Sequence, residues 1–287
     1  MRKLFYLLPT CIICFFTFSF FSNCNKAVSY KSPAGYDFSK PEKFELASAL
    51  NEISGIAFKN ENSDSVLAIE DEDGKLYTYS LSSKNFRRSK FGKKGDYEDI
   101  TIVNNNKVAV LRSEGSIFMF PVEETSNEKI GSVEVYDSIL PAGEYEGLFA
   151  EKDTLFALCK HCPSDKPSKA ITVYVLVYNA GTPLSVHRSF QIDISKIQSQ
   201  AADGKVKFHP SALAKNPLTK DWYIVSSVNK LLLVLDEQWN VKEVYPIDPA
   251  LFKQPEGIVF NNQGDLYISN EGGEGVANIL LFRYQKQ

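Results

Sequence analysis

The sequence is poor in the residues on which most metal and redox chemistry depends. Its 287 residues include five cysteines and three histidines. A zinc site built on Cys159 and Cys162 would need further Cys or His ligands, and His187 and His209 are the only histidines outside that motif. Haem attachment is excluded, because Pro163 follows the second cysteine where that motif requires histidine.

An excess of basic residues is also missing. There are 32 Lys and Arg residues against 35 Asp and Glu, which gives a net charge of −3 and a pI near 5.8. A dedicated nucleic-acid-binding protein needs a basic face, so we expect no nucleic-acid partner. The one basic cluster, between Arg87 and Lys94, is followed at once by acidic residues, which indicates a solvated loop.

Long hydrophobic runs are absent except at the N-terminus. Arg2 and Lys3 precede an almost wholly apolar run from Leu4 to Phe21, which ends near Cys24. This layout resembles a bacterial lipoprotein signal, in which Cys24 would become the lipidated first residue. The alternative is an uncleaved transmembrane anchor, since 18 apolar residues just suffice to span a bilayer. Either predicts a domain in the bacterial cell envelope, held to the membrane.

The sequence contains a short phrase that is repeated along the chain. A five-residue phrase that leads with Ser or Glu occurs five times, with starts 44, 48, 65 and 45 residues apart. This spacing is the period of a four-stranded propeller blade. The copies are Ser54–Phe58, Glu98–Ile102, Glu146–Ala150, Ser211–Lys215 and Glu256–Phe260.

Further strand-like runs follow each copy, and turn dipeptides such as Asp73-Gly74 separate them. No convincing long amphipathic helix is present, and the best candidate, 193–202, is brief. We therefore predict an all-β, five-bladed β-propeller, with six blades as the alternative.

The predicted organisation has three parts. Residues 1–24 form the signal segment, residues 25–43 a flexible tether, and residues 44–287 a single propeller domain. Pairing of Phe44–Leu50 with the last blade would close the ring and remove free sheet edges. We expect a monomer.

Three copies of the phrase begin with glutamate, at Glu98, Glu146 and Glu256. The first residue of each inner strand is expected to face the central channel, so these carboxylates would converge at one mouth. Calcium prefers such hard oxygen ligands, and a divalent cation would allow three close carboxylates to stay ionised. Alternatively, the glutamates accept backbone hydrogen bonds or pair with Arg112 and only close the blades.

Other residues at equivalent strand ends are candidate ligand contacts. Neutral oxygens and further charges there would complete a calcium site or contact a ligand bridged through it. These candidates are Glu52, Ser54, Arg112, Ser211, Asn270 and Glu271.

Two arrangements bear on catalysis and on covalent structure. No G-x-S-x-G elbow is present, so a serine hydrolase has no support. In an oxidising compartment, Cys159 and Cys162 are predicted to form a disulfide.

From the carboxylates at the channel mouth, we favour a calcium-binding protein that takes a ligand or partner there. A calcium-dependent hydrolase of phosphoesters or lactones, or an interaction scaffold, is the alternative.

Several motifs together resemble the SdiA-regulated family of bacterial propeller proteins, which is distantly similar to NHL-repeat propellers. The resemblance runs from about Leu50 to Tyr284, and it implies five blades and calcium at a recurring site. Lys160 and Pro210 depart from the family pattern, which tends to have acidic residues there. The motifs that carry the resemblance are Tyr97–Ile100, Tyr145–Leu148, His209–Leu213, Ser226–Leu231, Pro255–Ile258 and Tyr267–Glu271.

Overall fold

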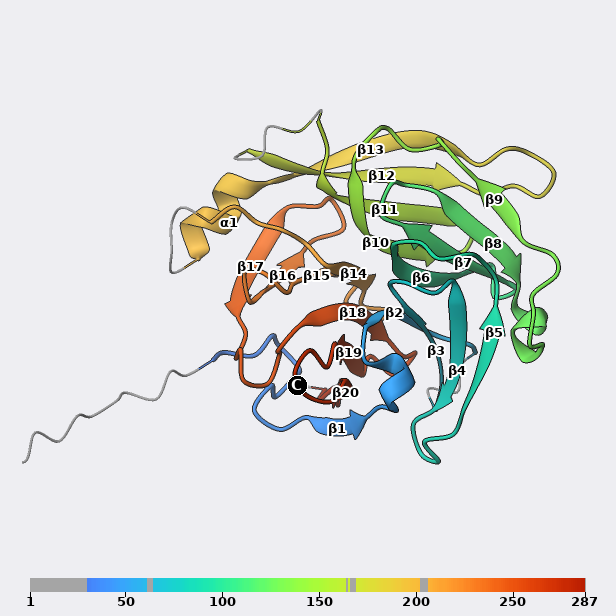
Figure 1. Cartoon of the computed structure of the whole chain (residues 1–287). Coiled ribbons are helices and arrows are strands. Elements are labelled where there is room, and N and C mark those ends of the chain that lie inside the picture. The colour runs from blue at the N-terminus through green and yellow to red at the C-terminus, as the bar shows by residue number, and fades with distance from the viewer. Residues whose placement is uncertain (1–29, 61–63, 164, 166–168, 202–205, 287) are drawn as a thin grey trace, which may run out of the picture.

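A computed structural model describes residues 30–60, 64–163, 165, 169–201 and 206–286. These residues form five four-stranded antiparallel sheets around a central channel, which confirms the prediction of a five-bladed β-propeller (Figure 1). The innermost strands contact one another in ring order, from β2 to β6, β10, β14 and β18 and back to β2. Six blades are thereby excluded.

Each of the first four blades is a meander whose first strand in the sequence lines the channel, and in the last blade β18 takes this inner position. The strands of the first two blades are β2 (Ile53–Phe58), β3 (Ser65–Glu70), β4 (Lys75–Ser80) and β5 (Phe86–Lys90), then β6 (Tyr97–Val103), β7 (Lys107–Arg112), β8 (Ile117–Pro121) and β9 (Glu134–Tyr136). Those of the next two are β10 (Glu144–Glu151), β11 (Thr154–His161), β12 (Ala170–Val177) and β13 (Ser185–Asp193), then β14 (Ala212–Lys215), β15 (Trp222–Ser226), β16 (Leu231–Leu235) and β17 (Val241–Pro246).

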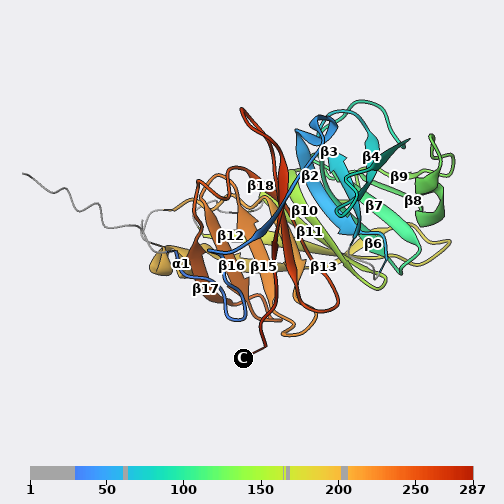
Figure 2. The ribbon, with the colours of Figure 1, turned by 90° about the horizontal axis from the view of Figure 1, so that it is seen from below.

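The last blade contains both ends of the domain. It consists of β18 (Pro255–Phe260), β19 (Leu266–Asn270), β20 (Asn278–Phe282) and β1 (Glu42–Glu45). Strand β1 pairs antiparallel with β20, with Phe44 opposite Ile279. Residues Ser48–Leu50, expected to extend this strand, instead form a 3₁₀ helix, η1. In the view from below, β2 and β18 lie side by side where the ring closes (Figure 2).

The segment before β1 also belongs to the folded body. Tyr36 and Phe38 are buried in the core between the last two blades. The Tyr36 hydroxyl donates to the carbonyl of Gly264 at 2.6 Å, and the Phe38 ring lies 4.4 Å from that of Phe282. The described part of the predicted tether therefore packs on the propeller from residue 36 onward, because the Tyr36 and Phe38 side chains have a core to enter. The predicted signal, Cys24 and residues 25–29 lie outside the described residues.

Helices contribute little. Helix α1 (Ile194–Gln200) lies inside the predicted 193–202 segment, and the Asp193 side chain caps it by accepting from the amide of Ser195. A second 3₁₀ helix, η2, spans Val122–Ser126. Within the described ranges, no helix has the length and apolar character needed to cross a membrane.

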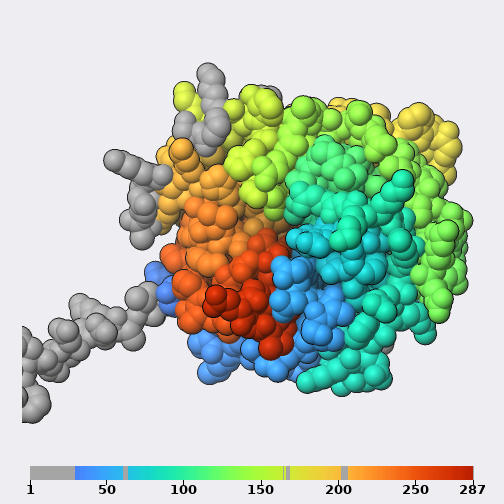
Figure 3. Space-filling view, in the orientation of Figure 1, coloured from blue at the N-terminus to red at the C-terminus, as the bar shows by residue number. Residues whose placement is uncertain are grey.

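The core is divided into clusters that lie between neighbouring blades, as expected for sheets packed face to face. Between the third and fourth blades, Trp222 stacks on Trp239 with ring centroids 4.2 Å apart and meets Phe156 edge-on at 4.8 Å. The first and last blades meet on the face shown in Figure 3, where blue and red atoms adjoin. Between these blades the amide of Gly272 donates to the carbonyl of Asn51.

Candidate functional site

The three predicted glutamates are positioned by β-bulges. In each of these three blades, the pairing of the innermost strand with its neighbour skips one residue of the innermost strand, and that residue is the glutamate. In the third blade the neighbouring strand also skips Lys160. The skips fall between Tyr97 and Asp99, between Tyr145 and Gly147, and between Pro255 and Gly257. A bulge re-aims a side chain out of the regular alternation. The carboxylates of Glu98, Glu146 and Glu256 therefore line the channel.

These carboxylates share one cavity of about 290 Å³, which we call the acidic mouth. Its lining includes seven carboxylates, three serines and one lysine, so a cation entering it would meet mostly negative charge. The lining residues are Ser54, Asp71, Asp96, Glu98, Glu144, Glu146, Lys160, Ser211, Ser227, Val228, Glu256 and Glu271.

The pKa values show that ionisation of the carboxylates in the acidic mouth is disfavoured by burial and by neighbouring negative charge. Burial, followed by repulsion from Glu146, raises the pKa of Glu98 to about 9. Burial and repulsion from Glu256 raise the pKa of Glu271 to about 8. Burial also raises the pKa of Glu256, although hydrogen bonds from Ser227 and Ser211 oppose the change. Each ionised carboxylate here lacks the compensation that water would provide.

Lys160 is the internal counter-ion of the acidic mouth. Its Nζ lies 2.6 Å from Glu146 Oε1 and 3.1 Å from Glu144 Oε1. Burial raises the pKa of Glu146, but the bond to Lys160 limits the rise to about 7. In the sequence, Lys160 stands out only as a basic residue where the SdiA-regulated family tends to have an acidic one. Its role as a counter-ion depends on the end of β11 lying beside the bulge in β10, which the residue type alone does not signal.

The predicted disulfide holds this lysine in place. Cys159 and Cys162 are bonded, so Lys160 and His161 lie within a closed four-residue loop. His161 Nδ1 is 2.6 Å from Glu144 Oε2, and its ring packs against that of His209 with centroids 5.0 Å apart. The loop therefore joins the counter-ion to the wall of the third blade.

Two candidate contacts lie elsewhere. Arg112 is directed away from the channel: it pairs with Glu114 at 3.1 Å and lies over the Tyr97 ring at 5.7 Å. Gly95 leaves room for it, since a Cβ there would lie 2.8 Å from Arg112 Nε. Asn270 is fully buried behind the mouth and donates to Asn278 Oδ1 at 3.3 Å. Neither Arg112 nor Asn270 is among the residues that line the acidic mouth.

The remaining candidates are near the cavity. Ser54, Ser211 and Glu271 line it. Glu52 is exposed outside the lining, yet its charge contributes to the raised pKa of Glu271. It therefore belongs to the rim of the acidic mouth.

Asp99, the residue after the first glutamate bulge, is not among the site residues that the sequence predicts. Its carboxylate is buried and accepts hydrogen bonds from the amides of Ile100 at 2.8 Å and Leu148 at 2.7 Å. Burial raises the pKa of Asp99 well above its ordinary value. Glycine stands at the same place in three other copies, including Gly55, where a Cβ would lie 2.4 Å from Asp99 Oδ1. When the five phrases are aligned, Asp99 is the one acidic residue at a position where three copies have glycine, and this was the signal available in the sequence.

The donor chemistry of the acidic mouth suits calcium, because carboxylates and hydroxyls are hard oxygen ligands. However, the carboxylates of the acidic mouth are widely spaced. Among the described residues, one group of three potential ligands lies within 4.8 Å, namely Cys159, Cys162 and Asp165, and its two sulfurs are joined to each other. The glutamates line the wall instead of forming a compact cluster, so a bound cation would draw them closer.

Comparison with known proteins agrees with this architecture. A family model described as SdiA-regulated matches residues 34–273. The search of curated proteins finds no match. A solved luciferin-regenerating enzyme has a TM-score of 0.52 at 11% identity, and the alignment covers 85% of this chain and 95% of that one. This likeness shows the fold alone.

Two other solved structures align less closely. The WD40 propeller domain of Doa1 has a TM-score of 0.49 at 10% identity, covering 88% of this chain and 98% of that one. A virginiamycin B lyase from Staphylococcus aureus has a TM-score of 0.45 at 14% identity, covering 84% and 69%.

Proposed function

Since the chain belongs to the SdiA-regulated family and its propeller has a strongly acidic channel mouth, we propose that it is a binding protein that holds calcium there together with a ligand. The observation that carries this proposal is that Glu98, Glu256 and Glu271 line one cavity and that burial raises the pKa of each. A divalent cation would neutralise these groups in their ionised form.

The calcium would be held by these three carboxylates with hydroxyl support from Ser211 and Ser227, which line the same wall. Calcium takes six to eight oxygen ligands, so positions would remain for oxygens of a bound solute. Lys160 already compensates Glu146, which leaves that carboxylate on the border of the site.

Calcium binding is tested by thermal unfolding and titration calorimetry of chelator-treated protein. A site filled at 100 times its dissociation constant stabilises the fold by about 2.7 kcal/mol, so calcium should raise Tm and chelator should lower it. Replacing Glu256 by Gln should weaken this response without unfolding the protein. Glu123→Gln, at an exposed position of η2, serves as the matched control.

The proposal fails if wild type shows neither calorimetric binding nor a calcium-dependent Tm, with elemental analysis excluding metal retained after chelation. It also fails if Glu256→Gln responds to calcium as strongly as Glu123→Gln does.

A calcium-dependent hydrolase is the second candidate. Glu146 has a pKa of about 7, within the range suited to a general base near neutral pH. Lactone and phosphoester substrates offered to wild type and Glu146→Gln, with and without calcium, separate the two candidates. Turnover that requires both calcium and Glu146 would establish that the protein is a hydrolase. Calcium binding without turnover would favour the binding protein.

The N-terminal layout supports a further part of the proposal, attachment to the membrane of the cell envelope through Cys24. Lipidated protein should partition with membranes, and Cys24→Ser should release it or block its maturation. Intact mass of the N-terminal peptide checks this directly, because an unmodified cysteine or an uncleaved leader would contradict lipid anchoring.

A further inference from the structure

Basic side chains gather at one cavity between the first and second blades. The basic cluster of the sequence, predicted to be a solvated loop, is divided between the outer strand β5 and the loop that leads from it to β6. A cavity of about 710 Å³ there, which we call the basic pocket, has no carboxylate among its lining residues. Five cations line it, namely Lys90, Lys93, Lys94, Arg112 and Lys129.

Backbone hydrogen bonds hold two of these lysines side by side. Lys90 and Lys129 are partners in an isolated parallel β-bridge. The amide of Lys90 donates to the carbonyl of Glu128, and the amide of Ile130 donates to the carbonyl of Lys90, both at 2.9 Å. Like charges held at paired positions repel each other. An anion bound between the two ammonium groups would remove this repulsion.

The loop that carries Lys93 is fixed by hydrogen bonds. The Tyr97 hydroxyl donates to the carbonyl of Lys93 at 2.9 Å. The amides of Phe91 and Gly92 both donate to the carbonyl of Gly74 at 3.0 Å. The backbone of the basic pocket is therefore held in place before a ligand arrives, and binding would order only the ends of the lysine side chains.

Two of the five cations are already engaged. Lys94 Nζ lies 3.9 Å from carboxylate oxygens of Glu72 and of Asp73, and Arg112 pairs with Glu114 at 3.1 Å. The other three, all exposed lysines, form no ion pair with any residue that the structure describes. They are the cations left to bind an anion.

Apolar surface lies beside these lysines. The Phe118 ring is partly buried, lines the basic pocket and meets the Tyr97 ring edge-on, with centroids 5.6 Å apart. The methylene groups of the lysine side chains add further apolar surface. The lining therefore suits an anionic group attached to an apolar body better than it suits a bare inorganic ion.

We propose that the basic pocket binds a phosphate monoester whose organic part is apolar. Such a phosphate carries about two negative charges near neutral pH. Its oxygens point in tetrahedral directions, so lysines from β5, from the β5–β6 loop and from the segment before β9 would contact it together. The organic part would lie against Phe118. The basic pocket shares no lining residue with the acidic mouth, so this binding does not depend on calcium.

Calorimetric titration of calcium-free protein with 1-naphthyl phosphate tests the proposal. One molecule should bind per chain, and the affinity should fall about tenfold between roughly 20 and 200 mM salt, because added salt screens exposed charges. Naphthoate has a smaller charge and inorganic phosphate has no apolar body, so each should bind at least about fivefold more weakly. Naphthoate or inorganic phosphate binding as tightly as naphthyl phosphate, or an affinity independent of salt, would overturn the proposal.

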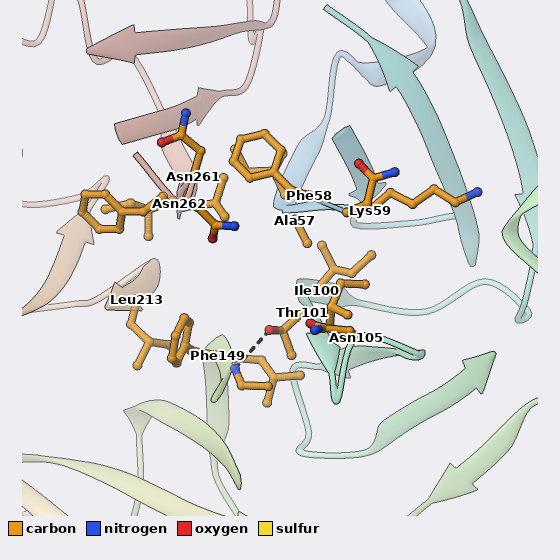
Figure 4. A pocket seen from close by; sticks show the side chains of 18 residues that line it. Ala57, Phe58, Lys59, Ile100, Thr101, Asn105, Phe149, Leu213, Asn261 and Asn262 are labelled. Carbon is orange, nitrogen blue, oxygen red and sulfur yellow. Dashed lines mark hydrogen bonds between the residues drawn. The ribbon is translucent and has the colours of Figure 1, made fainter. Parts of the chain in front are cut away.

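Lysine variants locate the site. Lys90→Gln and Lys129→Gln each remove one charge from an exposed side chain, and each should reduce the affinity about three- to tenfold without unfolding the protein. Lys59→Gln is the matched control. Lys59 lies at the edge of a separate cavity of about 480 Å³, shown in Figure 4, and its Nζ is 3.4 Å from Ser126 Oγ.

A lipid headgroup and a soluble compound offer the same phosphate chemistry. Sedimentation with phosphatidylcholine vesicles that contain phosphatidate separates them, since binding there that Lys129→Gln loses would assign the phosphate to a lipid. Naphthyl phosphate binding without sedimentation would assign it to a soluble ligand. Wild type that binds neither probe, or Lys90→Gln and Lys129→Gln variants that bind as Lys59→Gln does, would sink the proposal. Glu256→Gln should bind naphthyl phosphate normally, so this proposal and the calcium proposal can fail independently.

Discussion

Replacing Glu98 by glutamine is expected to stabilise the metal-free propeller at pH 8. In the folded state, burial and the charge of Glu146 raise the pKa of Glu98 from 4.5 to about 9. Glutamine has a similar shape and cannot ionise, so the variant avoids the cost of holding Glu98 protonated at a pH where the unfolded chain ionises it. We expect a gain in the free energy of unfolding of at least about 1 kcal/mol at this pH.

The pH dependence follows from the direction of the shift. Between pH 4.5 and about 9, the folded protein retains a proton on Glu98 that the unfolded chain has released. The stabilisation linked to this proton is complete below pH 4.5 and is lost as pH rises through 9. Glu271, whose pKa is raised to about 8, acts in the same direction. Wild type should therefore lose stability with rising pH, and Glu98→Gln should lose less.

Urea denaturation at pH 5 and pH 8, with chelator present, measures this difference. The advantage of Glu98→Gln should be larger at pH 8, and Glu123→Gln should show no such pH dependence. With calcium added, the order should reverse, because the variant has lost a ligand. A variant less stable than wild type at pH 8 without metal would mean that Glu98 is a blade-closing residue.

Truncating Phe38 to alanine is expected to destabilise the fold strongly. The Phe38 side chain is 5% exposed and packs between the rings of Phe252 and Phe282, at 5.5 and 4.4 Å. Removing a buried phenylalanine costs about 3–5 kcal/mol in the free energy of unfolding. Because the segment precedes β1, its loss should also loosen the strand that closes the ring.

The matched control is Phe86→Ala. Phe86 lies in β5, is 40% exposed, and should cost only about 1 kcal/mol when truncated. Urea midpoints of the two variants provide the comparison. Equal midpoints would mean that the residues before β1 behave in solution as a tether rather than as part of the propeller core.

The sequence alone determined the architecture, because each blade of a propeller is specified by a short local pattern that repeats along the chain. Five copies of one phrase at blade-like spacing specify five inner strands, and glutamate at the head of three copies places Glu98, Glu146 and Glu256 at one end of the channel. The short spacing of Cys159 and Cys162 made their disulfide predictable in the same way. These features depend on neighbours within a few residues.

Tertiary structure decided what the strand-end side chains contact. Lys160 reaches Glu146 because a bulge turns the glutamate toward it, whereas Arg112 finds its partners in Glu114 and the Tyr97 ring. Similarly, Tyr36 becomes part of the core only because the last two blades leave a place for its ring. Residue type and spacing specify strands and their order, but the direction of a side chain at a strand end depends on bulges and on surfaces that distant segments supply.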